Sequence, residues 1–289
     1  MEKKFSDLFA FDLDGTLVHS DPLTGERQVP AELLKKVFDI SLRAHVMVAT
    51  GRRYRAALPD IQVLPSLAYV VVHNGLVIRD ATGKLVERAI LEIDEALQIT
   101  KALAEFRDDY FFVCDGYESH IDYLYFEKAL QNSSLLRRVE DRAADHRKLL
   151  QSEEEFRLLF SKPHSGPLLE VALLGDYPEL LQIREAIRKK MSPTFNTIVV
   201  KNIGHRGLSV LEIFKKPYSK WWGVDWVKKK LGATRVIAIG DDENDLEMIE
   251  SADVGVAMKH AEPHILKVSK VQTDGPQGLA KFLEEFYSQ

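Results

Sequence analysis

The sequence predicts an α/β protein built on a doubly wound parallel sheet, with a second, α+β domain inserted into it. Short apolar runs alternate with helical segments through the first third of the chain, the alternation stops near Gly83, and it resumes after Pro217. Alternating strands and helices are typical of a parallel sheet with helices on both faces. We therefore predict a core of residues 1–83 and 217–289, and an inserted domain of residues 84–216.

The elements of the first core segment follow from their hydrophobic patterns. Continuous apolar runs indicate strands buried on both faces, and these runs are DLFAFDL (7–13), HVMVATG (45–51) and LAYVVVHNG (67–75). Apolar residues at helical spacing predict a helix from Pro30 to Ala44, with Pro30 placed to begin it. A second helix is expected from Arg52 as far as Pro59.

The inserted segment mixes strands and helices. We predict helices at 91–106 and 177–191, strands at 109–116, 119–126, 167–176, 195–203 and 208–214, and a mostly helical charged stretch from Glu127 to Glu155. After Pro217 we predict helices at 219–233, 243–252 and 275–288, and strands at 235–240 and 254–258.

Composition excludes several classes of protein. The 289 residues carry a formal net charge of −5, so no basic surface is expected to attract nucleic acid or an anionic membrane. The single cysteine, Cys114, excludes an internal disulfide, and its place after the apolar run YFFV indicates a buried structural thiol. We see neither a signal peptide nor an apolar stretch long enough to cross a membrane, and we therefore expect a cytoplasmic protein.

Two acidic clusters lie where predicted strands end. Asp12 and Asp14 follow the first strand in FAFDLDGTLVHS, and Asp241 follows a later strand in VIAIGDDENDLEMI. Ligands of open parallel sheets bind outside the carboxyl ends of the strands. If the two strands are neighbours, the three carboxylates converge, and each raises the pKa of the others unless a cation intervenes. A hard divalent cation such as Mg²⁺ suits such a site when it also handles phosphate.

Each acidic cluster also has a simpler interpretation. Asp and Gly favour turns, so Asp12 and Asp14 alone are compatible with a solvated turn before a helix. Asp242 and Glu243 stand at a predicted helix start, where acidic side chains complement the helix dipole, and we favour that interpretation for these two.

Two further strand ends supply groups suited to an anion. VMVATGRRY places Thr50, Gly51 and Arg52 at a strand–helix junction, where a hydroxyl and backbone N–H groups form an anion site. Lys220 follows Ser219, a predicted N-cap, and a lysine there opposes the helix dipole unless it faces an anion. The alternative for Lys220 is an ordinary surface lysine.

Together these stretches resemble the four motifs of the haloacid dehalogenase-like hydrolases. FAFDLDGTL, VMVATGRRY, the SK before WWG, and IGDDENDLEMI stand in the order of that family. The long insertion between the second and third motifs resembles the Cof-type sugar-phosphate phosphatase branch, in which an α/β cap is inserted at this point. HNGLVI and ADVGVAM extend the resemblance through nearly the whole chain.

The resemblance implies a Mg²⁺-dependent phosphatase acting on a small phosphorylated metabolite. It implies that Asp12 is the nucleophile, forming an aspartyl-phosphate, and that Asp14 is the general acid and base. The implied metal ligands are Asp12, the main-chain carbonyl of Asp14, and Asp241, with Asp245 orienting them. The implied phosphate-binding residues are Leu13, Thr50, Gly51, Arg52, Lys220 and Asn244.

Several points stay open at the level of sequence. Members of the family commonly read AMGNA where this chain reads VAMKHA, so Lys259 and His260 are either a tolerated loop change or an altered edge of the site. A phosphomutase or other phosphotransferase is an alternative on the same scaffold, and a non-catalytic phosphometabolite-binding protein is a third. We expect the inserted domain to set the substrate, and its polar candidates are Asp115, Glu118, His120, His205 and Arg206. The sequence does not indicate an oligomeric state.

Overall fold

The computed structural model describes residues 5–20, 25–132, 146–161, 166–191, 193–201 and 208–287. The chain divides into two compact units. The core unit comprises Met1–Arg88 and Tyr218–Gln289, and the inserted unit comprises Ala89–Pro217.

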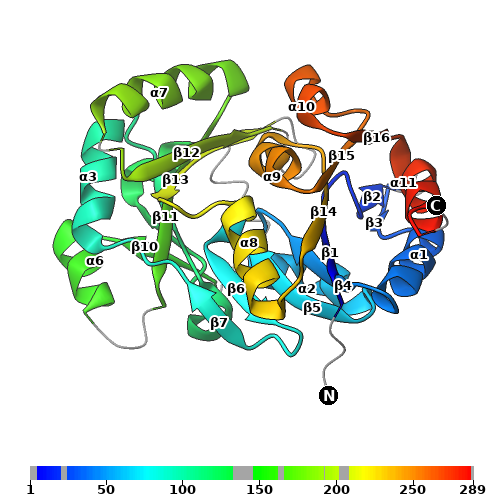
Figure 1. Cartoon of the computed structure of the whole chain (residues 1–289). Helices are drawn as coiled ribbons and strands as arrows, with labels where there is room; N and C mark the ends of the chain where they lie inside the picture. Colours follow the sequence, from blue (N-terminus) through cyan, green and yellow to red (C-terminus); the bar gives the residue numbers. More distant parts are fainter. Residues whose placement is uncertain are drawn as a thin grey trace. The chain divides into compact units, whose positions relative to one another are not determined.

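The core unit consists of a sheet with helices on both faces (Figure 1). Its elements are β1 (Asp7–Phe11), β2 (His19–Ser20), β3 (Arg27–Gln28), α1 (Ala31–Ser41), β4 (His45–Ala49), α2 (Tyr54–Val63), β5 (Leu67–Val72), β6 (Val77–Asp80), β7 (Leu85–Arg88), α8 (Lys220–Leu231), β14 (Arg235–Gly240), α9 (Leu246–Ser251), β15 (Val254–Met258), α10 (Pro263–Val268), β16 (Val271–Thr273) and α11 (Gly275–Glu285). Short 3₁₀ turns occupy His73–Gly75 and Glu243–Asp245.

The predicted α/β fold class is confirmed by the order of the strands in the core sheet. The order is β16-β15-β14-β1-β4-β5-β6-β7, and every pair from β16 to β5 is parallel. Two strands that the sequence analysis did not predict, β6 and β7, extend the sheet in antiparallel fashion. They follow the turn at Asn74 and Gly75, which reverses the chain after β5.

The packing of β1 on both of its faces explains why its sequence is almost uniformly apolar. Leu8 and Ala10 belong to a core cluster with Val224 of α8. Phe9 lies on the other face, where its ring centroid is 5.1 Å from that of Phe286, next to α11. Figure 1 shows α8 and α9 on one side of this sheet and α1 and α11 on the other. A strand buried on both faces needs apolar side chains at successive positions.

The register of the central strands fixes where the acidic residues meet. Phe11 of β1 pairs with Ile239 of β14, and the backbone N–H of Asp12 donates to the carbonyl of Ile239 at 2.9 Å. Because β14, β1 and β4 are parallel neighbours, the residues that follow them emerge at the same edge of the sheet.

The inserted unit is an antiparallel sheet with helices packed on one face. Its elements are α3 (Ile93–Leu103), β8 (Phe111–Cys114), α4 (Gly116–Ser119), β9 (Tyr123–Phe126), β10 (Arg147–Leu150), α6 (Glu153–Phe160), β11 (Leu168–Gly175), α7 (Tyr177–Lys190), β12 (Phe195–Val200) and β13 (Ser209–Lys215), with a 3₁₀ turn at Glu127–Gln131. The strand order is β10-β9-β8-β11-β13-β12, in which the pair β10–β9 is parallel.

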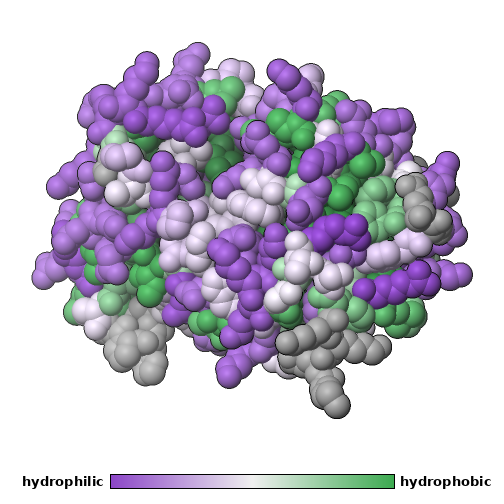
Figure 2. Space-filling model, in the orientation of Figure 1, coloured by the Kyte–Doolittle hydropathy of each residue, from purple (hydrophilic) through white to green (hydrophobic). Residues whose placement is uncertain are grey.

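The core of the inserted unit lies between this sheet and the helices α3, α6 and α7. Phe112 of β8 stacks on Phe156 of α6 at 4.4 Å between ring centroids, and Ile183 of α7 joins the same cluster. Cys114 is buried there, as predicted, and burial raises the pKa of its thiol. The opposite side of α7 is hydrophilic, and Figure 2 shows this side in purple at the top left of the view.

Some boundaries differ from the predicted ones. Helix α2 does not stop at Pro59 but continues to Val63. Pro59 costs the helix one backbone hydrogen bond, but its φ is compatible with a helix, and burial of Ala57 and Ile61 on either side of it favours continuation. The charged stretch Glu127–Glu155, predicted to be mostly helical, contains the edge strand β10, which pairs with β9 and was not predicted; residues 133–145 lie outside the described part. The short elements α10 and β16 were not predicted. Within the described residues, no helix is long and apolar enough to span a bilayer.

Candidate active site

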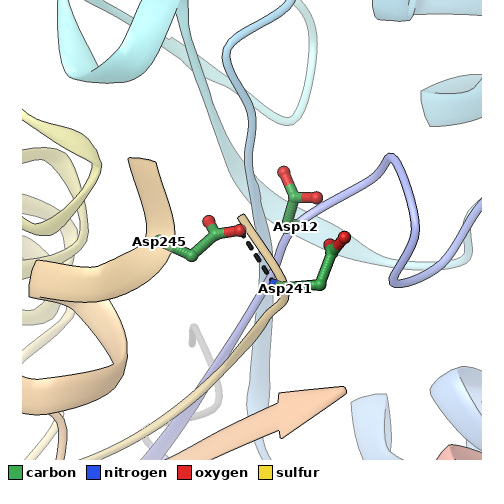
Figure 3. A group of neighbouring side chains, drawn as sticks. All are labelled: Asp12, Asp241 and Asp245. Carbon is green, nitrogen blue, oxygen red and sulfur yellow. Dashed lines mark hydrogen bonds between the residues drawn. The ribbon is translucent and has the colours of Figure 1, made fainter. Parts of the chain in front are cut away.

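Three carboxylates meet at the carboxyl edge of the core sheet (Figure 3). Asp12 follows β1, Asp241 follows β14, and Asp245 ends the short turn before α9. One carboxylate oxygen from each lies within 4.8 Å of the others. Oδ2 of Asp245 accepts the backbone N–H groups of Asp241 and Asp242, each at 3.1 Å, which ties the acidic loop to the start of α9.

Lys220 is the cation that faces this cluster. Its Nζ lies 2.6 Å from Oδ1 of Asp12 and 2.7 Å from Oδ1 of Asp245, and the residue is 2% exposed. Ser219 caps α8 by accepting the backbone N–H of Trp222 at 3.1 Å, and thereby fixes the start of the helix from which Lys220 projects. Lys220 is therefore not the surface lysine of the alternative interpretation.

The electrostatics of the cluster are unbalanced without a further cation. Burial raises the pKa of Asp12 well above its ordinary value; Lys220 opposes this shift, and Asp245 and Asp241 add to it. Burial disfavours the ammonium of Lys220, but the carboxylates of Asp12 and Asp245 outweigh it and raise the pKa of Lys220. One ammonium cannot balance three ionised carboxylates, and carboxylate oxygens are the ligands that hard divalent cations prefer. The donor set therefore fits such a cation.

The side chain of Asp241 is held from two sides. Oγ1 of Thr16 donates to Oδ1 of Asp241 at 3.0 Å, and Nε2 of His260 lies 3.0 Å from Oδ2. Gly15, with φ of +83°, allows this approach, because a Cβ at that position would lie 2.3 Å from Oδ2 of Asp241. His260 is thus in contact with the acidic cluster, whereas the exposed Lys259 forms an ion pair with Asp274 at 3.5 Å.

The carboxylate of Asp14 faces arginines instead of the other acids. Nε and Nη2 of Arg52 donate to its two oxygens, each at 2.5 Å, and Arg27 forms a second ion pair with it. Arg52 also donates through Nη1 to Asp60 on α2, at 2.5 Å. Arg52, which was predicted to bind phosphate, therefore contacts two carboxylates in this structure. The sequence analysis did not identify Arg27 or Asp60 as part of the site, and no sequence pattern singles them out.

The remaining predicted phosphate ligands gather around the end of β4. Thr50 is buried, and its Oγ1 accepts the backbone N–H of Arg52 at 3.2 Å. A Cβ on Gly51 would lie 2.8 Å from Oδ1 of Asn74 and 3.0 Å from Nδ2 of Asn244, and these two atoms are themselves 2.9 Å apart. Gly51, Asn74 and Asn244 are thus immediate neighbours.

Two residues at this edge differ from their expected place. The sequence analysis did not name Asn74 as a site residue, although its place after the next parallel strand, β5, is the signal that it belongs to this edge. The side chain of Leu13 is fully buried, and its carbonyl accepts backbone N–H groups of Leu17 and Val18. Any contact of Leu13 with phosphate would have to come from its own backbone N–H.

The other two acidic residues of the loop support its conformation. Asp242 accepts the backbone N–H of Glu243 at 2.7 Å and caps the short turn, in keeping with a role at a helix start. Burial raises the pKa of Asp242 to about 6, with smaller contributions from Asp245 and Asp241. The carboxylate of Glu243 lies 2.7 Å from Nε2 of His264 on α10.

The polar candidates of the inserted unit are only partly described. Asp115 is buried, Glu118 lies on the short helix α4, and His120 ends that helix with φ of +63°. His205 and Arg206 lie outside the described residues.

Comparison with known proteins places the chain among phosphoryl-group hydrolases. The family model of haloacid dehalogenase-like hydrolases matches residues 9–283. The chain is 25% identical to the 5-amino-6-(5-phospho-D-ribitylamino)uracil phosphatase YitU of Bacillus subtilis, over 97% of both chains. It is 26% identical to an HMP-PP phosphatase of Serratia proteamaculans, over 89% of this chain and 85% of the other. The fold matches that of a phosphatase of the haloalkanoate (HAD) enzyme superfamily from Bacteroides thetaiotaomicron, with a TM-score of 0.72, 18% identity, and 100% and 97% coverage.

Proposed function

Because the chain belongs to the haloacid dehalogenase-like hydrolases, we propose that it is a Mg²⁺-dependent phosphatase that hydrolyses phosphoric monoesters of small metabolites through an aspartyl-phosphate. The observation that carries the proposal is the buried carboxylate of Asp12, which lies beside a lysine and two further acids at the carboxyl edge of the sheet. A site that only binds phosphate has no use for an anionic nucleophile placed among its ligands.

The residues at this edge fit a Mg²⁺ ion. Asp12, Asp241 and the main-chain carbonyl of Asp14 would hold it, and bound Mg²⁺ would neutralise charge on the phosphoryl oxygens. Asp245 fits the role of orienting the ligands, because Oδ1 accepts from Lys220 and Oδ2 accepts two backbone N–H groups.

In the first step, an oxygen of Asp12 forms a bond to phosphorus. The bond between phosphorus and the ester oxygen breaks, and the leaving oxygen takes a proton from the carboxyl group of Asp14. Lys220 and the amide of Asn244 would stabilise negative charge on the phosphoryl oxygens, and Thr50 and Gly51 would bind them from the end of β4.

In the second step, water attacks phosphorus and gives a proton to the carboxylate of Asp14. The bond between phosphorus and Asp12 breaks, and inorganic phosphate leaves. The structure supports this half of the reaction, because the two arginines around Asp14 stabilise its ionised form, which is the form that accepts a proton. We propose that the inserted unit, residues 84–216 by sequence, selects the substrate, because the groups at the edge of the core sheet would contact only the phosphoryl group that all monoesters share.

The substitution Asp12→Asn tests the assignment. We expect it to abolish release of inorganic phosphate from p-nitrophenyl phosphate and from a panel of phosphorylated sugars and nucleotides, because an amide is a poor nucleophile. Wild-type enzyme should lose activity in EDTA and regain it with Mg²⁺ better than with Ca²⁺, since Ca²⁺ accepts looser geometry. Asp225→Asn is the matched control, because Asp225 lies on the surface of α8 and pairs with Lys229.

Two results would contradict the proposal. If folded Asp12→Asn keeps a rate within about tenfold of wild type, which is a barrier difference of about 1.4 kcal/mol, Asp12 is not the nucleophile. If the metal-free wild type is fully active, Mg²⁺ has no part in the reaction. Measuring inorganic phosphate itself separates a phosphatase from a phosphotransferase, which would pass the phosphoryl group to another hydroxyl.

A further inference from the structure

The segment after β15 contacts the acidic loop through two histidines. His260 lies next to Asp241, and His264 lies next to Glu243, at Nε2–carboxylate distances of 3.0 Å and 2.7 Å. The two histidine side chains are almost equally exposed, at 52% and 51%. They differ in what they contact, because Asp241 belongs to the three-carboxylate cluster and Glu243 does not.

The contact between His260 and Asp241 has a defined direction. An ionised carboxylate can only accept hydrogen bonds, so the ring of His260 must donate its Nε2–H to Oδ2 of Asp241. Thr16 donates to the other oxygen, Oδ1. Each oxygen of Asp241 therefore carries one hydrogen bond from the protein and keeps lone pairs for a cation.

Asp241 needs such support more than Asp245 does. Both oxygens of Asp245 are fixed by Lys220 and by two backbone N–H groups. Within the described part of the chain, Lys220 forms hydrogen bonds to Asp12 and Asp245 but none to Asp241. Repulsion from Asp12 and Asp245 therefore favours rotation of the Asp241 side chain away from the cluster. The hydrogen bonds from Thr16 and His260 oppose that rotation.

We propose that His260 is a positioning residue, which holds the carboxylate of Asp241 in the orientation that binds the divalent cation. The inference rests on the proposed function, because it assumes that Asp241 is a ligand of Mg²⁺. The proposal gives a role to His260, which stands where members of the family commonly have an asparagine. Partners of metal ligands typically change metal affinity by about 10- to 100-fold when they are removed.

Three substitutions in the full-length protein test the role of His260. His260→Leu removes the donor, His260→Gln keeps an N–H near the position of Nε2, and His264→Leu removes the neighbouring histidine–carboxylate contact. Isothermal titration calorimetry with Mg²⁺ measures the affinity directly. A second measurement is the Mg²⁺ concentration that half-activates hydrolysis of p-nitrophenyl phosphate, compared with kcat at saturating Mg²⁺.

We expect His260→Leu to weaken Mg²⁺ binding by about 10- to 100-fold. His260→Gln and His264→Leu should stay near the wild-type affinity, and kcat of His260→Leu should recover at saturating Mg²⁺. Equal losses in His260→Leu and His264→Leu would overturn the inference, because the segment would then merely support the loop. Unchanged affinity in His260→Leu, with normal binding by wild type, would overturn this inference alone. Failure of the wild type to bind Mg²⁺ would overturn the proposed cofactor as well.

Discussion

Replacing Lys220 by methionine removes the ammonium that forms ion pairs with both Asp12 and Asp245. Methionine has a similar length and fits a buried position, so the change removes the charge and two hydrogen bonds with little change in volume. We expect Lys220→Met to destabilise the metal-free protein strongly, because two buried carboxylates lose the group that compensates them.

The size of the effect follows from the contact distances. At 2.6 Å and 2.7 Å, each ion pair has a Coulomb energy of about 6 kcal/mol for an effective dielectric constant of about 20. Desolvation of the ammonium of Lys220, a residue that is 2% exposed, offsets most of this energy. Removal of one partner from a buried ion pair typically costs about 3–5 kcal/mol, and we expect a loss in that range.

The loss should also depend on pH. The pKa of Asp12 already lies above its ordinary value of 3.8, so the folded protein binds more protons than the unfolded chain above that pH. Stability therefore falls as the pH rises toward the folded-state pKa of Asp12. Without Lys220 this pKa rises further, and the deficit of Lys220→Met should be larger at alkaline than at mildly acidic pH.

Urea denaturation in EDTA measures the free energy of unfolding of both proteins. The matched control is Lys229→Met on the same helix. Lys229 forms an ion pair of similar length with Asp225, but the side chain of Lys229 is 75% exposed. An exposed pair of this kind contributes about 0.3–0.5 kcal/mol. If Lys220→Met costs no more than Lys229→Met, the ammonium does not balance the buried carboxylates and the electrostatic argument is wrong.

Two further predictions concern the surroundings of the site. Arg52→Lys should lower kcat by about tenfold or more with little change in KM, because an ammonium cannot hold both oxygens of Asp14 and the carboxylate of Asp60 together. Steady-state kinetics measure both constants, and an unchanged kcat would show that the guanidinium does not position Asp14. Burial raises the pKa of Asp242 to about 6, so the folded protein binds more protons than the unfolded chain between pH 3.8 and about 6. The free energy of unfolding should therefore fall as the pH rises through that range. Asp242→Asn should flatten this slope in urea denaturation without metal, and an unchanged slope would assign it to other groups.

The central strands of the core could be predicted because their environment leaves little choice of residue. β1, β4 and β14 have helices on both faces, so their sequences are continuous apolar runs. β6 was missed because Arg79 interrupts its pattern. In the structure this arginine is fully buried, and its guanidinium lies 4.8 Å from the ring centroid of Tyr54. The burial of Arg79 depends on contact with Tyr54, which lies 25 positions earlier in the chain, and local periodicity does not reveal such a contact.

The acidic residues of the site could be predicted for a similar reason. In a parallel sheet, the residue after a buried strand emerges at the ligand-binding edge, and this rule suffices to place Asp12 and Asp241. The ion pairs of Arg52 and Arg27 follow no such rule, because they depend on how α2 and the paired strands β2 and β3 pack. Asn74 lies between these cases, since its strand was predicted but its contact with Asn244 was not.

The place of β1 in the sheet has a consequence for synthesis of the protein on the ribosome. β1 pairs with β4 on one side, but its other neighbour, β14, begins only at Arg235. At typical elongation rates of about 5–20 residues per second, the second edge of β1 stays unpaired for roughly 10–45 seconds. All strands of the inserted unit lie between residues 89 and 217, so its sheet is complete in the nascent chain before that edge is covered. An apolar strand with an open edge is a substrate for chaperones and for aggregation, and the hazard is greatest during this interval of translation.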